Sequence, residues 1–351
     1  SLAYFCFNHG FPLTLRSAFF PILGDRVWGF SGHLIDILAV FATIFGLATS
    51  LGYGAEQVAA GMDHLFGITV TDGVKVGLII GITAIALVSV VAGLDAGVKR
   101  LSEINMVMAV LLLFFVLLAG ATSEVLGRFA TGAMDYIRYM VPLSNPFGRE
   151  DTGFFHGWTT FYWAWWIAWS PFVGMFIARI SKGRTVREFL SAVILIPTAI
   201  TLVWMSAFGG IAIEQVINQV GELGQNGLTD ITLSLFYAFD AMPMGTLLSV
   251  ISIVLIMVFF ITSSDSASLV VDSITSGGKV DAPIPQRIFW ASVEGAIAAM
   301  LLWIGGTEAI QALQAGTIST GLPFTVILLT MCVSLLMGMR TELQHHKFSY
   351  A

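Results

Sequence analysis

The chain carries little charge. Of its 351 residues, 11% are Asp, Glu, Lys or Arg, whereas 56% are hydrophobic. Soluble domains carry about 25% charged residues, so the composition excludes an ordinary water-soluble domain. The net charge of −6 argues against a nucleic acid partner, which would select a basic surface. The two cysteines, Cys6 and Cys332, are too few for a disulfide framework.

Histidine is absent from the most apolar stretches. All six histidines lie outside them: His9, His33, His64, His156, His345 and His346. A buried Ser–His pair is therefore unavailable, and no His–carboxylate spacing typical of a metal site falls in an apolar stretch. A membrane enzyme would have to rely on Ser263 or Ser264 with Asp265, and we expect neither an enzyme nor a cofactor. A channel would favour rings of polar residues around a pore, which the pattern does not indicate.

Long apolar runs dominate what is present. A membrane-spanning helix needs roughly 20 mostly apolar residues. Eight stretches qualify: Ile37–Ala55, Gly77–Leu94, Ile104–Ser123, Gly157–Ala178, Phe189–Ile213, Ala241–Ser264, Ile288–Gly306 and Leu322–Met339. Glu294 is the one clear charge inside these apolar centres. The sequence therefore predicts an all-α polytopic membrane protein with about eight spans, in one integral domain because no long polar linker divides them.

The basic residues predict an orientation. If eight helices cross the membrane, 12 of the 16 Lys and Arg residues fall on one side. The other side keeps Lys75, Arg128, Arg138 and Arg149. Because loops rich in Lys and Arg stay in the cytoplasm, both ends of the chain are expected there, with the protein multi-pass in the plasma membrane, the inner membrane of a bacterium.

Tryptophan is concentrated in one span. Five of the nine tryptophans fall in WTTFYWAWWIAWSPF, residues 158–172. On a helix, an arc of about 100° holds Trp158, Tyr162, Trp165, Trp166, Trp169 and Phe176, while Trp163 lies off it. Pro171 removes a helical hydrogen bond and is expected to free the carbonyl of Ile167. Aromatic faces attract cations, quaternary ammonium groups especially. Ordinary packing or lipid-facing rings remain the alternative.

A second stretch offers oxygen ligands. Phe259-Phe260-Ile261-Thr262-Ser263-Ser264-Asp265 places adjacent hydroxyls in an apolar segment, where they suit a small cation. The alternative is that each hydroxyl hydrogen-bonds back to its own helix, as Ser and Thr often do. Asp265 is a functional candidate because carboxylates within membrane segments usually are.

Three segments carry a family resemblance. WTTFYWAWWIAWSPFVGMFIARISKGRT, ITSSDSASLVVDSIT and TIFGLATSLG resemble signature helices of the betaine/choline/carnitine transporter family, and the resemblance runs through the whole chain. It implies twelve spans, ten of them in two inverted five-helix repeats of the leucine-transporter type. The eight stretches resemble helices five to twelve, a partial form of that fold. Because the chain opens on SLAYFCF, like the tail of a hydrophobic helix, we expect the natural protein to extend upstream of Ser1.

The resemblance also implies a division of the domain. Residues 1–351 would form a single transporter domain. Its expected parts are a cytoplasmic connector and helix tail (1–31), the rest of the first repeat (32–123), an outer loop (124–156), the second repeat (157–340) and a cytoplasmic tail (341–351).

The site residues follow from the family motifs. Trp166 would face the trimethylammonium group, and Trp165 and Trp169 would line its cytoplasmic path, with Tyr162 on the same arc. One sodium site is implied at the Phe259 carbonyl and the Thr262 and Ser263 hydroxyls. A second sodium position matches Thr43, Asn105 and Phe172, but Leu47 replaces a threonine expected one turn after Thr43, which leaves proton coupling open.

The expected function is secondary active transport. The substrate would be a small quaternary ammonium solute such as glycine betaine, choline or carnitine, with sodium as the coupling ion. The alternatives are a proton-coupled or exchange-type carrier and a truncated, transport-inactive homologue. The expected surroundings are the lipid bilayer and, by resemblance, two further copies in a homotrimer.

Overall fold

The fold is helical throughout. A computed structural model describes residues 1–92, 95–120, 122–279 and 283–349, and no strand occurs within these ranges. This confirms the predicted all-α class. The longer helices are α2 (Phe30–Phe66), α3 (Asp72–Ala92), α4 (Asp95–Ala119), α5 (Thr122–Ser144), α7 (Phe161–Ile180), α8 (Val186–Trp204), α12 (Gly245–Thr275), α13 (Ile284–Gly305) and α14 (Ala309–Ser349).

Seven helical segments in the described ranges are long and apolar enough to cross a membrane. They are Phe30–Phe66, Asp72–Val91, Lys99–Ala119, Val186–Ile217, Gly245–Thr275, Ile284–Gly305 and Ala309–Gln344. Each contains most of one predicted span. The eighth predicted span, the tryptophan-rich one, forms the 20-residue helix α7 but does not reach the hydropathy of the other seven. Indole and phenol rings carry a polar N–H or O–H, so a helix rich in them scores as less apolar than one rich in Leu.

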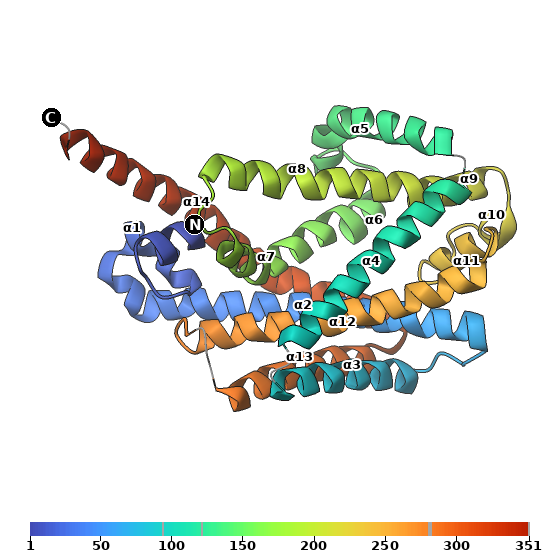
Figure 1. Ribbon diagram of the computed structural model, residues 1–351, viewed down its shortest axis with the longest axis horizontal. Helices are drawn as coiled ribbons and strands as arrows, with labels where there is room; N and C mark the ends of the chain where they lie inside the picture. Colours follow the sequence, from blue (N-terminus) through green and yellow to red (C-terminus); the bar gives the residue numbers. More distant parts are fainter. Residues whose placement is uncertain (93–94, 121, 280–282, 350–351) are drawn as a thin grey trace.

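The helix α2 forms the centre of the bundle. It is 37 residues long, about 55 Å at 1.5 Å per residue, so it exceeds the roughly 30 Å hydrocarbon core of a bilayer. It packs against α12, α14, α7, α13 and α3. Figure 1 shows it running through the middle of the molecule, with α14 and α12 crossing nearby. Every candidate site residue therefore lies on α2 or within one or two helices of it.

Small residues let other helices approach α2 closely. A Cβ added at Gly46 would lie 2.9 Å from Cδ1 of Trp169 and 3.2 Å from Cβ of Ala168. A Cβ added at Gly54 would overlap the ring of Phe260 on α12. The four-residue spacing of Gly46, Ser50 and Gly54 thus forms a smooth face on which α7 and α12 pack, as small residues do in membrane helix pairs.

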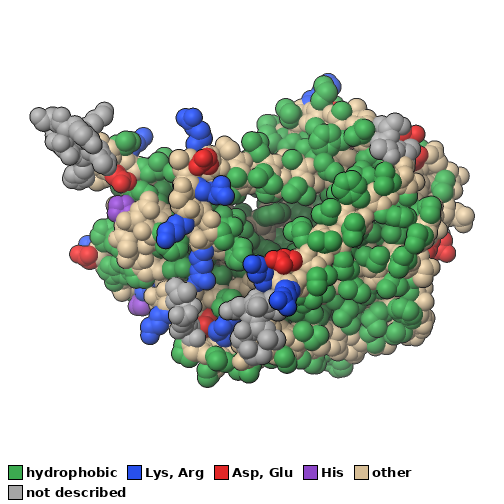
Figure 2. All heavy atoms as spheres, viewed as in Figure 1, with side chains coloured by type: hydrophobic (Ala, Val, Ile, Leu, Met, Phe, Trp, Pro, Cys, Tyr) green, Lys and Arg blue, Asp and Glu red, His purple; other side chains and the backbone are tan. Residues whose placement is uncertain are grey.

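Basic side chains gather toward one end of the molecule. Figure 2 shows most of the visible Lys and Arg side chains in the left half of this face and hydrophobic side chains over most of the right half. Figure 1 shows the N-terminus and the last turns of α14 at that same left end. The placement of both ends in the cytoplasm stays a prediction.

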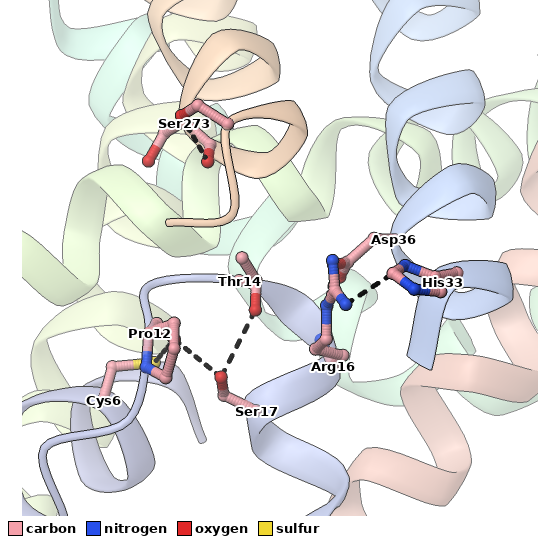
Figure 3. Close-up of polar contacts among 9 residues, drawn as sticks. Cys6, Pro12, Thr14, Arg16, Ser17, His33, Asp36 and Ser273 are labelled. Carbon is pink, nitrogen blue, oxygen red and sulfur yellow. Dashed lines mark hydrogen bonds and ion pairs between the residues drawn. The ribbon is translucent and has the colours of Figure 1, made fainter. Parts of the chain in front are cut away.

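The connector before α2 is fastened by an ion pair. The guanidinium of Arg16 lies 2.5 Å from the carboxylate of Asp36, and the Arg16 backbone N–H donates to the same carboxylate at 3.0 Å. A second guanidinium nitrogen lies 3.2 Å from Nδ1 of His33 (Figure 3). Both partners are largely buried, so this contact fixes the connector against the first turns of α2.

The connecting segments contain more helix than the sequence suggested. The predicted connector holds η2 (Leu15–Phe19), α1 (Phe20–Leu23) and η3 (Gly24–Trp28), after η1 (Ala3–Asn8). The predicted outer loop contains α5, α6 (Thr152–Phe154) and η4 (Phe155–Thr160). After α8 come η5 (Met205–Gly209), α9 (Gly210–Ile217), α10 (Gly221–Asn226) and α11 (Ser234–Asp240), and η6 (Gly306–Glu308) precedes α14. The predicted tail 341–351 continues α14 as far as Ser349, and its last two residues lie outside the described ranges.

Candidate functional site

Two indoles of α7 are anchored to α2. The Nε1–H of Trp165 donates to the backbone oxygen of Gly46 at 3.1 Å and to Oγ of Ser50 at 3.2 Å. The Nε1–H of Trp169 donates to the same Gly46 oxygen at 3.0 Å. A buried indole N–H needs an acceptor, and the absence of a side chain at Gly46 exposes its carbonyl to both rings. These hydrogen bonds fix the orientation of Trp165 and Trp169.

An aromatic stack extends from Trp165. Its ring lies 5.3 Å from that of Phe161 and 5.7 Å from that of Tyr53, both in stacked geometry. The Tyr162 ring meets Trp165 edge to face at 5.8 Å and stacks on Trp158 at 5.9 Å. The predicted site residues Trp165 and Tyr162 are therefore in direct contact. Tyr53, which comes from α2, belongs to the stack although the sequence did not single it out.

Trp166 points away from this stack. Its side chain is 67% exposed, while that of Trp163, placed off the aromatic arc by the sequence, is 59% exposed. The structure therefore brings Trp165 and Trp169 together on α2 and leaves Trp166 with open ring faces on another side of α7. Exposure alone does not distinguish Trp166 from Trp163, so the special role of Trp166 stays a prediction.

The carbonyl near Pro171 is occupied. The sequence predicted that Pro171 would free the backbone oxygen of Ile167. Instead, the hydroxyl of Ser170 donates to that oxygen at 2.6 Å, and α7 continues unbroken from Phe161 to Ile180. The expectation of a freely exposed carbonyl was wrong because the neighbouring serine replaces the missing N–H donor.

The candidate sodium ligands on α12 lie close together. The Thr262 hydroxyl donates to the backbone oxygens of Phe259 at 3.0 Å and Val258 at 3.1 Å. The side chain of Ser263 is buried, with 9% of its surface exposed. Ser264 is fully buried, and its Oγ has no hydrogen-bond partner in the described part of the chain. The alternative expectation, that Thr262 hydrogen-bonds back to its own helix, is therefore met. The hydroxyl oxygen of Thr262 still keeps lone pairs that a cation can use, because in these bonds it acts only as the donor.

The second set of candidate ligands is spread over three helices. Thr43 on α2 is buried and donates to the Ala39 oxygen at 2.8 Å. Phe172 on α7 meets Trp169 edge to face at 5.5 Å. Asn105 lies on α4, which packs chiefly on α12, and its Oδ1 is buried without a partner among the described residues. The helices α2 and α7 pack against each other, but among the described residues neither has a main interface with α4.

Leu47 lies where the family resemblance led us to expect a threonine. Its side chain is 1% exposed and belongs to an apolar cluster with Ala48, Leu51 and Ile79. An apolar cluster offers a small cation no ligand. The second candidate position therefore receives no side-chain oxygen from residue 47.

The helix α14 supplies a polar wall that sequence reasoning missed. The hydroxyl of Thr49 on α2 lies 2.6 Å from that of Thr317 and 3.0 Å from the backbone oxygen of Leu313. The amide of Gln314 donates to the Tyr53 hydroxyl at 2.8 Å, which orients that ring in the aromatic stack. The spacing of Gln314 and Thr317 could have indicated this polar face from the sequence, because residues three apart share one helix face.

The sequence matches known transporters along nearly its whole length. The family description that matches residues 1–344 is BCCT, betaine/carnitine/choline family transporter. A Vibrio parahaemolyticus protein named glycine betaine transporter 1 is 64% identical over 98% of this chain and 66% of its own length. Another from that organism, named a glycine betaine/proline/choline/ectoine transporter, is 61% identical over 99% of this chain and 62% of its own length. A protein of Acinetobacter baylyi named glycine betaine transporter is 42% identical over 97% of this chain and 52% of its own length.

The matches agree with the resemblance read from the three motifs. The chain spans less than two thirds of the length of each of these three relatives. The matched family and the named relatives are transporters and not enzymes, which removes the Ser–Asp enzyme alternative. The chain belongs to the betaine/carnitine/choline transporter family.

Proposed function

We propose that this protein transports a quaternary ammonium solute such as glycine betaine, choline or carnitine, and that α7 supplies an aromatic wall of the binding site. The observation that carries the proposal is the pair of indoles anchored by one carbonyl. Because the N–H groups of Trp165 and Trp169 are held by Gly46, the rings are fixed before a ligand arrives. A methylated ammonium group cannot be held by hydrogen bonds, and each desolvated indole face attracts it by roughly 1–2 kcal/mol.

The named relatives support the choice of substrate class. Two of them are named for glycine betaine alone, and one also for proline, choline and ectoine. Trp166, 67% exposed, presents an indole face that a ligand can cover. Secondary active transport fits a protein whose apolar helices bury hydroxyl oxygens next to an aromatic site.

We propose one coupling sodium ion on α12. The Phe259 oxygen and the Thr262 hydroxyl are 3.0 Å apart, and Ser263 follows directly, so three oxygens can surround one point. Thr43, Asn105 and Phe172 form a weaker candidate for a second ion because Leu47 contributes no oxygen. Coupling to protons or exchange of solutes is the alternative. Insertion in the bacterial inner membrane, cytoplasmic ends and a homotrimer complete the proposal, supported by the distribution of basic residues and by the family.

Replacement of Trp166 tests the aromatic wall. In the complete gene product, we expect Trp166→Leu to reduce uptake of labelled glycine betaine strongly, and Trp166→Phe to retain part of it because a ring face survives. The matched control is Trp163→Leu on the same helix with similar exposure, 59%. Equal losses at the two positions, with equal protein in the membrane, would indicate general damage to α7 and overturn the proposal.

Removal of two hydroxyls tests the ion site. We expect Thr262→Ala with Ser263→Ala to raise the sodium concentration for half-maximal uptake many-fold, because two of the three oxygens are lost. Solute binding at saturating sodium should change far less. The control is Thr275→Ala, whose hydroxyl also bonds back to α12, at 2.8 Å, but lies more than three turns away. Uptake that ignores sodium and follows a pH gradient would reject this site.

A further inference from the structure

Glu294 is a fully buried acid that the proposed site does not use. It lies within α13, a segment apolar enough to cross a membrane, and its side chain is 0% exposed. The residues one and two turns away on the same face, Ala291, Ala298 and Leu302, are also 0% exposed and apolar. Ionisable residues inside membrane segments are rare and usually functional.

The carboxyl group has no partner where the helices pack. Both oxygens of Glu294 lack a hydrogen-bond partner within the described ranges, and so does Oγ1 of Thr83 on α3. The next residue, Gly295, marks a close approach of the two helices, since a Cβ there would overlap the Thr83 side chain. Because Glu294 is 0% exposed, bulk water does not touch its side chain in this arrangement.

Among the described residues, no basic side chain pairs with Glu294. The elements packed against α13 are α2, α3, α12, α14 and η6. Their described charged or titratable groups are His33, Asp36, Tyr53, Glu56, Asp63, His64, Asp72, Lys75, Asp265, Asp272, Glu308, Cys332, Arg340 and Glu342, and α13 itself adds Arg287. Several of them have partners elsewhere: Asp36 pairs with Arg16, Glu56 and Asp72 with Lys75, His64 with Asp240, and Glu342 accepts from the Tyr4 hydroxyl. No described side chain forms a hydrogen bond with Glu294.

An ionised carboxylate in such surroundings would be far costlier than the neutral acid, because nothing replaces its hydration. We propose that Glu294 is a proton-binding site, occupied while α3 and α13 are packed as in this structure and emptied when they separate and water reaches the group. On release, the O–H bond breaks, the proton passes to water and the electron pair stays on the carboxylate. The site would make the proposed transport cycle, on which this inference rests, sensitive to pH.

Infrared spectroscopy tests the bound proton without using transport. The purified 351-residue chain in lipid vesicles should show the carbonyl band of a protonated carboxylic acid at neutral pH, where ordinary glutamates are ionised. Glu294→Gln should lose that band. The matched control, Glu103→Gln on α4, removes a 63% exposed carboxylate and should leave the band unchanged. Identical spectra for the wild type and Glu294→Gln would overturn the proposal.

Transport in the complete gene product tests release of the proton. A single titrating group changes a rate by at most about tenfold per pH unit. We expect the uptake rate of the wild type and of Glu103→Gln to vary with pH by up to about this factor. In Glu294→Gln, which cannot exchange a proton, the uptake rate should change by a factor of about one per pH unit, which means that it no longer depends on pH over that range. A Glu294→Gln variant with the wild-type pH profile would show that the proton never leaves, and would overturn the switching role.

The two measurements separate this inference from the proposed function. If no solute is transported but the acid band vanishes only in Glu294→Gln, the transport proposal fails and the proton site stands. If solute is transported and the band is absent, the proton site fails and the transport proposal stands.

Discussion

Two faces of α7 carry the same residue type in different environments. On one, Trp165 and Trp169 donate their N–H groups to Gly46 of α2. On the other, Trp163 and Trp166 are 59% and 67% exposed. The comparison teaches that an indole can serve either as an anchor, through its N–H, or as an open surface, through its ring. The residue type is the same, and the neighbouring helix decides which use applies.

The largest expected effect breaks the anchored face. Gly46→Ala places a Cβ 2.9 Å from Cδ1 of Trp169 and 3.2 Å from Cβ of Ala168, so α7 must shift. We expect the free energy of unfolding to fall by about 1–3 kcal/mol, as overpacking does. It is measured by thermal unfolding in detergent micelles. Gly77→Ala on α3, where nothing lies within 4 Å, should instead be neutral or stabilising by up to about 1 kcal/mol. The same sign at both positions would contradict the close α2–α7 contact.

A smaller effect separates the two kinds of tryptophan. Trp165→Phe keeps a ring in the aromatic stack but removes the N–H that Gly46 and Ser50 accept. We expect a loss of about 1 kcal/mol in the free energy of unfolding. Trp166→Phe, which removes no such bond to α2, should leave stability nearly unchanged while it weakens solute uptake. If Trp166→Phe destabilises the protein as much as Trp165→Phe, the division of α7 into an anchored and an open face is wrong.

The smallest expected effect concerns the segment that leads into α7. The guanidinium of Arg149 hydrogen-bonds Asp151 and lies 4.9 Å from the centre of the Phe155 ring. The hydrogen bond from Arg149 lowers the pKa of Asp151 below its usual value. A carboxyl group whose folded pKa is depressed adds stability above its unfolded pKa, and that stability is lost as pH falls through the folded pKa.

We therefore expect Asp151→Asn to lower the melting temperature slightly at neutral pH, with the difference from the wild type vanishing in acid. Because the pair is at the surface, added salt should also shrink the difference. A difference that grew as the pH fell would contradict this assignment. The anchored face of α7 should not respond to either change, since hydrogen bonds between neutral groups hold it.

The sequence was sufficient for the class of fold and for the family. Apolar runs of about 20 residues predict spanning helices because a backbone in lipid must satisfy its own hydrogen bonds. Seven of the eight predicted spans reach the hydropathy of a crossing helix. The eighth, α7, is helical as predicted but contains too many rings with polar atoms. The WAWWIAWSPF and TSSDS motifs also led to the family that the comparisons show.

Only the tertiary structure decided how those residues are used. Winding α7 as an isolated helix put Trp166 on one arc with Trp165 and Trp169, yet packing on Gly46 selects two of the three and leaves the third exposed. Helical periodicity gives the direction of a side chain but not the neighbour that it meets. Likewise, the sequence marked Glu294 as a charge in an apolar stretch. That both its oxygens are unpartnered in the described structure, beside the tight contact of α3 and α13, depends on which helices pack together, because burial and hydrogen bonding are properties of the assembled bundle.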